Sequence, residues 1–298
     1  MNFTGKLAVI TGGGAGMGAE LARQLAAQGC HVAICDVSQS NLDETVALCR
    51  HQAPDDTRIS AFVANVAAEA DFLAFRDHIR VTHRTEQLDL LFNNAGIGGG
   101  GYSFIADTRE RWEEVFNVNW GGVYLGVRTF LPMLLASPQA RIVNMSSVNG
   151  FWAGLSATES LVAYSTAKFA VRGFTEALIT DLRLRAPHIE VSVVMPGYIG
   201  TSLVRNSMSY LDGAGDADVA AVDASFQQNA PMSAAAAATT ILDGVRAGKW
   251  RILVGEDAAV LDQAVRDNPE GVYEPAFFER MTAAGVFATM PKPPAAVN

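Results

Sequence analysis

Residues 6–36, KLAVITGGGAGMGAELARQLAAQGCHVAICD, decide the fold. The apolar run at 7–10 predicts a buried strand, and a glycine-rich turn follows it at 11–18. Leucines on one side predict a helix after the turn, which Gly29 closes, and the apolar run at 32–35 predicts a second buried strand that ends at Asp36. Strand, glycine turn, helix, strand and acid form the βαβ layout of dinucleotide-binding proteins.

The glycine turn and Asp36 also indicate which dinucleotide the chain binds. Glycines let backbone amides approach a pyrophosphate, and the helix N-terminus adds a favourable dipole. Asp36 is placed to accept hydrogen bonds from the adenosine ribose, and it would repel the 2′-phosphate of NADP. Val37, Ser38 and Ala15 supply no cation for that phosphate. We therefore expect NAD as the cofactor rather than NADP.

The rest of the chain continues the alternation of strands and helices. Further strands are predicted at 59–66, 88–92, 140–145, 190–195 and 250–255, and helices at 40–50, 68–84, 109–136, 162–186 and 233–247. This order predicts an α/β fold with a Rossmann-type, doubly wound sheet of seven parallel strands. No repeat or linker divides the sequence, so we expect a single dinucleotide-binding catalytic domain over 1–298. Within it, residues of about 202–232 are expected to form a substrate lid, and about 256–298 a C-terminal extension.

Composition excludes several classes of function. The 298 residues are 49% apolar and carry a net charge of −9, which argues against nucleic acid and anionic membranes as partners. No apolar run reaches the length of a bilayer span, and the N-terminus has no signal-peptide layout. The three cysteines are an odd number in one short segment, as in a reduced, cytoplasmic protein. No Cys/His spacing fits zinc, so no metal site is expected.

Polar residues follow three of the predicted strands. They are Asn93-Asn94-Ala95-Gly96, Ser146-Ser147 and Pro196-Gly197-Tyr198-Ile199-Gly200-Thr201. Ligands of open α/β sheets bind at the carboxyl ends of the strands, which favours a site there. Taken alone, the Asn/Gly segment is more typical of an ordinary strand-ending turn than of a ligand site.

Tyr164 and Lys168 lie four residues apart on a predicted helix, so both face the same side. A nearby ammonium favours the phenolate, and lowering the pKa of tyrosine from about 10 to neutrality takes about 4 kcal/mol. Such a tyrosine is a suitable general acid/base for an alcohol proton. Without further context, the same pair is typical of a helix surface. Asn119, a polar residue among apolar ones, fits either a structural amide or a member of a proton relay.

Together these segments resemble the short-chain dehydrogenase/reductase (SDR) family from about Lys6 to Gly255. The resemblance rests on the glycine turn, the Asn-Asn-Ala-Gly segment, the helix asparagine, the strand-end serine, the Tyr/Lys pair and the Pro-Gly segment, in that order. It implies an oxidoreductase that transfers a hydride between NAD(H) and a secondary alcohol or ketone.

The resemblance also implies a role for each site residue. Tyr164 would be the general acid/base, and Ser147 would bind the substrate oxygen. Lys168 would lower the pKa of Tyr164 and contact the nicotinamide ribose, and Asn119 would hold a water that links Lys168 to solvent. The implied cofactor-binding residues are Thr11, Gly12, Gly14, Gly16, Met17, Gly18, Asp36, Asn65, Val66, Asn93, Ala95, Gly96, Tyr164, Lys168, Pro196, Gly197, Ile199 and Thr201.

The sequence departs from the family in the segment between Ser147 and Tyr164, which is longer than usual. Ser146 and Ser156 therefore remain alternatives to Ser147. Another departure is Asn65, which stands where the family often has aspartate.

The residues around the predicted pocket indicate an apolar or bulky substrate. Trp152, Tyr198, Leu203 and Met208 are the substrate candidates, with Tyr102 and Phe104 beside them. By resemblance, helices at about 109–136 and 162–186 join copies of the chain into a homodimer or homotetramer. Two other functions stay open: a non-catalytic NAD-binding sensor, and an epimerase or dehydratase that retains NAD.

Overall fold

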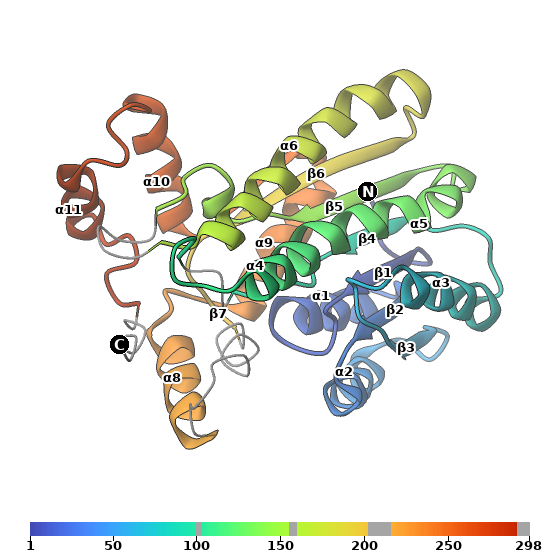
Figure 1. Cartoon of the computed structure of the whole chain (residues 1–298). Helices are drawn as coiled ribbons and strands as arrows, with labels where there is room; N and C mark the ends of the chain where they lie inside the picture. The colour runs from blue at the N-terminus through green and yellow to red at the C-terminus, as the bar shows by residue number, and fades with distance from the viewer. Residues whose placement is uncertain (99–102, 155–159, 202–215, 291–298) are drawn as a thin grey trace.

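One parallel sheet forms the centre of the computed structural model, which describes residues 1–98, 103–154, 160–201 and 216–290 (Figure 1). Within these residues, seven parallel strands pair in the order β3-β2-β1-β4-β5-β6-β9. The strands are β1 Leu7–Thr11, β2 His31–Asp36, β3 Ile59–Val63, β4 Leu90–Asn93, β5 Ala140–Met145, β6 Ile189–Pro196 and β9 Arg251–Val254. The predicted α/β fold and seven-stranded sheet are confirmed.

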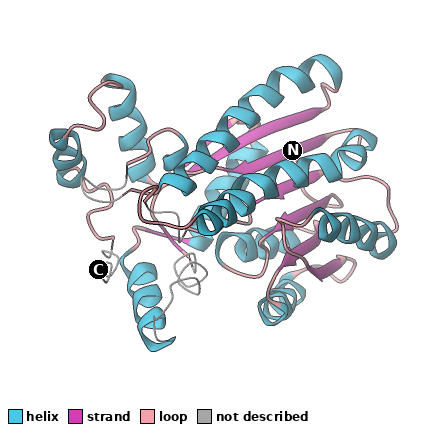
Figure 2. Cartoon of the chain, viewed as in Figure 1, coloured by secondary structure: helices cyan, strands magenta, loops and turns pink. Residues whose placement is uncertain are grey.

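Helices cover both faces of the sheet because the strands are apolar on both sides (Figure 2). In β1, Ala8 and Ile10 enter one core, and Leu7 and Val9 enter the other. The first face is covered by α1 Gly16–Ala27, α2 Gln39–Gln52 and α9 Ala234–Arg246. The second face is covered by α3 Glu69–His83, α5 Gly122–Ala136 and α6 Val162–Arg185. Helix α1 is sandwiched between α2 and α9.

A third group of helices lies beyond the carboxyl ends of β5 and β6. Figure 1 shows α8 Asp216–Asn229, α10 Glu256–Asp267 and α11 Pro275–Ala283 gathered at that end of the molecule. A short parallel pair, β7 Ile199–Gly200 and β8 Met232–Ser233, lies there as well. Helices α10 and α11 build a core of their own with the segment that follows β5. The site is therefore bordered by the C-terminal part of the chain.

The single helix expected over 109–136 is divided in the structure. Helix α4 Arg109–Phe116 leads into a π-helical turn over Asn117–Gly121, and α5 follows. The Gly122 N–H donates to Asn117 O, five residues back, which widens the helix at this point. The Asn119 amide fills the widened turn, donating to Val115 O at 2.9 Å and to Ile97 O at 2.8 Å.

Two helices occupy segments where the sequence predicts none. Helix α8 falls inside the expected lid, whose alanines and scattered polar residues lack the apolar spacing of an amphipathic helix. Contact with β7 supports it from the rest of the fold. Helix α11 begins at Pro275, a residue well suited to a first helical turn.

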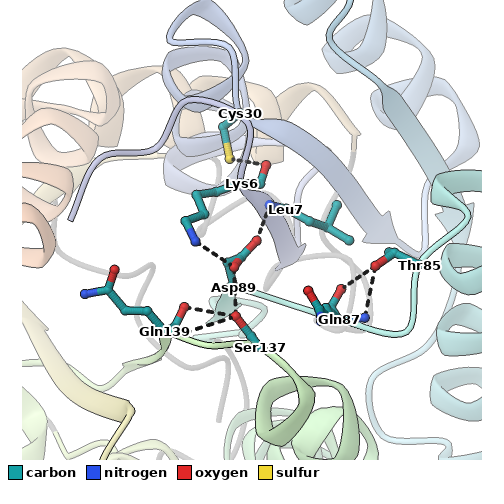
Figure 3. A network of polar contacts seen from close by, with 8 residues as sticks. All are labelled: Lys6, Leu7, Cys30, Thr85, Gln87, Asp89, Ser137 and Gln139. Atoms are coloured by element: carbon teal, nitrogen blue, oxygen red, sulfur yellow. Dashed lines mark hydrogen bonds and ion pairs between the residues drawn. The ribbon is translucent and has the colours of Figure 1, made fainter.

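Asp89 links three segments at the amino-terminal ends of the strands (Figure 3). Its carboxylate accepts from Lys6 Nζ at 3.1 Å, from the Leu7 N–H at 2.9 Å and from Ser137 Oγ at 2.8 Å. One side chain thus joins the start of β1, the start of β4 and the loop before β5. The network therefore lies at the opposite end of the strands from the candidate site.

Candidate active site

The glycine turn packs directly on the loop that follows β4. Gly12 has a φ of 63°, and a side chain there would come within 2.8 Å of the Ala95 Cα. A Cβ on Gly18 would overlap the Gly12 carbonyl oxygen. Glycine is required at both positions because the helix and the neighbouring loop approach the turn so closely. The turn leads into α1, whose N-terminus has no side-chain cap.

Asn94 holds that turn in place. Its side-chain amide donates to Thr11 O at 3.0 Å and to Gly12 O at 3.2 Å. The Thr11 hydroxyl in turn accepts from the N–H groups of Asn94 and Ala95 at 3.0 and 3.1 Å. The ends of β1 and β4 are therefore locked together beside the glycines.

Asp36 lies at the end of β2 with its carboxylate turned toward the glycine turn. One oxygen accepts from the Gly14 N–H and the other from the Ser38 N–H, each at 3.1 Å. A negative charge is thus fixed at the place where the sequence predicts the adenosine ribose.

The strand-end serines have different partners. Ser146 donates to Lys168 O at 2.8 Å, so its hydroxyl is used inside the fold. Ser147 accepts from the Asn149 N–H at 3.1 Å and also hydrogen-bonds the Tyr164 side chain. The structure therefore brings Ser147, and not Ser146, to Tyr164. Ser156 lies outside the described residues.

Lys168 completes the group from one turn further along α6. Its amine lies 5.4 Å from the centre of the Tyr164 ring and donates to Met145 O at 3.0 Å. Asn119 faces the same point from the π turn. A Cβ added to Gly96 would lie 2.7 Å from Asn119 Oδ1 and 3.5 Å from Lys168 Nζ. Asn119 Oδ1 is buried and has no hydrogen-bond partner among the described residues.

Burial shifts the acid–base properties of both groups. Desolvation raises the pKa of Tyr164, and the hydrogen bond with Ser147 opposes that rise. Desolvation also lowers the pKa of Lys168 to about 7. The expected lowering of the Tyr164 pKa by Lys168 is therefore not found for the protein alone.

The Pro-Gly turn after β6 is held by a residue that the sequence did not single out. Asp257, at the start of α10, accepts from the Tyr198 N–H at 2.6 Å and from the Ala258 N–H at 2.9 Å. Burial raises the pKa of this carboxyl, and the backbone N–H groups of Tyr198 and Ala258 oppose the rise. The turn ends against the glycine turn, since a Cβ on Gly16 would lie 3.2 Å from the Thr201 Cβ.

Several predicted residues take supporting places around this centre. Asn93 is buried and donates to Asn144 Oδ1 at 2.8 Å, and Asn144 donates to Thr175 Oγ1 at 3.0 Å, which joins β4, β5 and α6. Asn65 Oδ1 accepts from the Ala67 N–H at 2.9 Å. The buried Val66 packs against Gly122.

The substrate candidates are dispersed. Trp152 is buried in the C-terminal core, where its Nε1 donates to Val272 O at 3.0 Å. Tyr198 is buried, and its hydroxyl donates to Phe226 O of α8. Phe104 is exposed. Tyr102, Leu203 and Met208 lie outside the described residues.

Asn94 and Asp257 bond the two turns of the site, and the sequence did not indicate these contacts. Asn94 was visible as the second member of the Asn-Asn-Ala-Gly segment, but its position beside the glycine turn was not. Asp257 had no local signal, because it follows an ordinary strand and only the fold brings it to Tyr198.

Among the described residues, no helix has the length and apolar character needed to cross a membrane. Over the same ranges, no three His, Cys, Asp or Glu side chains cluster in a way that suits a metal ion.

Comparisons with known proteins agree with this geometry. Residues 6–211 match the family model described as short chain dehydrogenase. SadH of Mycobacterium tuberculosis, whose name describes a candidate oxidoreductase, is 34% identical over 294 residues, or 97% of this chain and 98% of SadH. Levodione reductase of Leifsonia aquatica is 32% identical over 210 residues, covering 70% of this chain and 75% of the reductase. A solved short-chain dehydrogenase/reductase of Burkholderia phymatum, in complex with NAD, has a TM-score of 0.79 at 27% identity and covers 92% of this chain and 98% of its own.

Proposed function

Because this chain belongs to the short-chain dehydrogenase/reductase family, we propose that it transfers a hydride between NAD(H) and an apolar or bulky secondary alcohol or ketone. Membership makes it an oxidoreductase with a Rossmann fold for a nicotinamide cofactor. The observation that carries the proposal is the grouping of Ser147, Tyr164, Lys168 and Asn119 at one point.

The cofactor fits the residues at the carboxyl edge of the sheet. The glycine turn leads into the N-terminus of α1, which has no side-chain cap and so suits a pyrophosphate, and Asp36 lies beside the turn for the ribose hydroxyls. Met17, Asn65 and Val66 would hold the adenosine half. Other residues would line the rest of the bed: Asn93, Ala95, Gly96, Pro196, Gly197, Ile199 and Thr201.

The proton chemistry belongs to the chain itself. When bound, NAD supplies the hydride acceptor and a positive ring that favours the phenolate of Tyr164. In alcohol oxidation, Tyr164 takes the hydroxyl proton while Ser147 donates a hydrogen bond to the same oxygen. Lys168 is placed beside Tyr164 to pass that proton on, and Asn119 Oδ1 is free to hold the water that carries it to solvent. In ketone reduction, the proton travels the other way.

The decisive experiment replaces Tyr164 and measures turnover and cofactor binding separately. Tyr164→Phe removes the proton donor, and we expect kcat to fall by about 10²-fold or more while NADH binding is kept. Ser147→Ala should lose a comparable factor, whereas the matched control Ser146→Ala should not, because the Ser146 hydroxyl donates to Lys168 O inside the fold. An active Tyr164→Phe enzyme would contradict the mechanism. NADH binding without any turnover of alcohols or ketones would favour a sensor, and tightly held NAD with no net redox change would favour an epimerase or dehydratase.

We also propose NAD rather than NADP, on the position of Asp36. Its carboxylate is fixed by two backbone N–H groups, so it cannot swing away from a 2′-phosphate without losing both bonds. A kcat/KM for NADP equal to that for NAD would refute this preference.

The substrate, assembly and location follow as further parts of the proposal. Val148 and Phe151, just after Ser147, are buried with the C-terminal helices, which supports an apolar surrounding for the substrate. A single catalytic domain is proposed to act in the cytoplasm; residues 202–215 of the expected lid lie outside the described residues. Exposed Tyr124 on α5 and Phe169 on α6 support a homodimer or homotetramer through these helices, which gel filtration with light scattering would test.

A further inference from the structure

The turn after β6 is fixed at its far end by the glycine turn and needs a second support. Thr201 packs on Gly16, so the position of residues 197–201 sets the depth of the site between the two turns. On the proposed function, this turn faces the nicotinamide half of the cofactor, whereas the glycine turn and Asp36 face the other half. A shift at the Tyr198 end of the turn, away from the contact of Thr201 with Gly16, would therefore act on the nicotinamide half.

Two hydrogen bonds support the start of the turn, at Gly197 and Tyr198. Gly197 donates its N–H to Val254 O of β9 at 2.9 Å. The next N–H, that of Tyr198, has the Asp257 carboxylate as its acceptor at 2.6 Å. A carboxylate acceptor makes this bond stronger than one between neutral groups. Asp257 is buried, so water does not compete for it.

Helix capping alone does not explain Asp257. An acidic residue at a helix start commonly bonds its own first turn, and one oxygen of Asp257 does so through the Ala258 N–H. The other oxygen leaves the helix and bonds Tyr198, which is distant in sequence. The carboxylate therefore joins α10 to the turn.

The surrounding glycines are shaped for this carboxylate. A Cβ on Gly197 would overlap both oxygens of Asp257, and a Cβ on Gly255 would overlap one of them. Gly255 also has a φ of 106°, a conformation that favours glycine. The turn and the strand end thus leave room for a charged group that a side chain at either position would displace.

We infer that Asp257 is a positioning residue for catalysis, which holds the 197–201 turn over the nicotinamide end of the site and makes α10 part of the active-site structure. The inference rests on the proposed function for the identity of the ligand. Asp257 touches neither substrate nor cofactor and acts through the Tyr198 backbone.

The test separates the two halves of the cofactor. NADH probes the whole site, and ADP-ribose, which lacks the nicotinamide, probes the adenosine and pyrophosphate half. In Asp257→Asn the amide presents a donor to one of the two N–H groups. We expect the Kd of NADH to rise about tenfold and kcat to fall, while the Kd of ADP-ribose stays within about twofold.

Asp262→Asn is the matched control. Asp262 lies on the same helix, is partly buried and pairs with Arg251 of β9, but it does not contact the turn. We expect this variant to bind NADH and ADP-ribose as the wild type does. Equal losses in both variants, or equal weakening of NADH and ADP-ribose in Asp257→Asn, would overturn the inference and assign Asp257 to fold stability.

A second variant covers a failure of Asp257→Asn to fold, which an absence of soluble protein would reveal before any ligand is added. Asp257→Glu keeps the charge and alters only its reach, and it should weaken NADH selectively; unchanged NADH binding there would overturn the inference. The result is distinct from failure of the proposed function, in which the wild type binds NADH yet turns over no alcohol or ketone.

Discussion

Replacing Lys168 by methionine should stabilise the ligand-free protein at acidic pH while abolishing its activity. Lys168 is buried, and desolvation lowers its pKa from 10.5 to about 7. Methionine has a similar length and no charge, so Lys168→Met removes the cost of burying an ammonium group. It also removes the hydrogen bond to Met145 O.

The pH dependence of stability follows from the pH range over which Lys168 is protonated in the folded chain and in the unfolded chain. Below about pH 7 both states are protonated, and the full shift of the pKa corresponds to about 5 kcal/mol of lost stability. Between about pH 7 and 10.5 the unfolded chain keeps a proton that the folded chain releases, so wild-type stability rises by about 1.4 kcal/mol per pH unit. Leaving the Met145 carbonyl without its partner costs the variant about 2 kcal/mol. We expect Lys168→Met to be more stable by about 3 kcal/mol at pH 6 and to lose that advantage near pH 9.

Urea denaturation of both proteins from pH 6 to 9 measures this difference. The two curves of unfolding free energy against pH should converge as the pH rises, because only the wild type gains stability. Parallel curves, or a variant that is less stable than the wild type at pH 6, would refute the reasoning. Turnover should be undetectable in the variant, since Tyr164 loses the group beside it.

Three further changes have separate readouts. Asp89→Asn should lower the free energy of unfolding by about 2 kcal/mol and leave kcat/KM unchanged, because the network lies at the opposite edge of the sheet; a loss of activity at equal stability would contradict this. Trp152→Ala should lower the free energy of unfolding by about 3–5 kcal/mol, whereas Trp152→Phe should lose roughly 1–2 kcal/mol, and equal effects would argue against the packing and hydrogen bond described. Asp36→Ser should lower the ratio of kcat/KM for NAD over NADP at least about tenfold, and an unchanged ratio would show that Asp36 does not select the cofactor.

The fold was predictable because the sequence patterns that indicate its strands and helices are short and recur along the chain. Each β-strand is a short apolar run, and alternation with helices leaves few arrangements for them. The places of the glycine turn, Ser147, Tyr164 and Lys168 at strand ends or on one helix face were predictable for the same reason, whereas their roles stay predictions that rest on the resemblance. The π turn was not, because it depends on the Asn119 amide reaching Ile97 O in another segment.

Residues whose role depends on distant partners escaped sequence reasoning. Trp152 looked available to a substrate, but residues 272–287, far along the chain, bury it. Asp257 carried no signal at all until the fold placed it beside Tyr198. The roles of Ser146 and Ser147 were separable only by the directions of their hydroxyl groups, which sequence does not encode.

The position of α1 between α2 and α9 has a consequence for biosynthesis. Leu21 and Leu25 of α1 share one apolar core with Ile241 and Leu242 of α9, and the two helices are in contact. A chain emerging from the ribosome can pair β1 with β2 early, but the side of α1 that contacts α9 stays open until residues 234–246 have been made. We expect nascent chains arrested before residue 234 to bind chaperones that recognise exposed apolar helices, and full-length chains to release them.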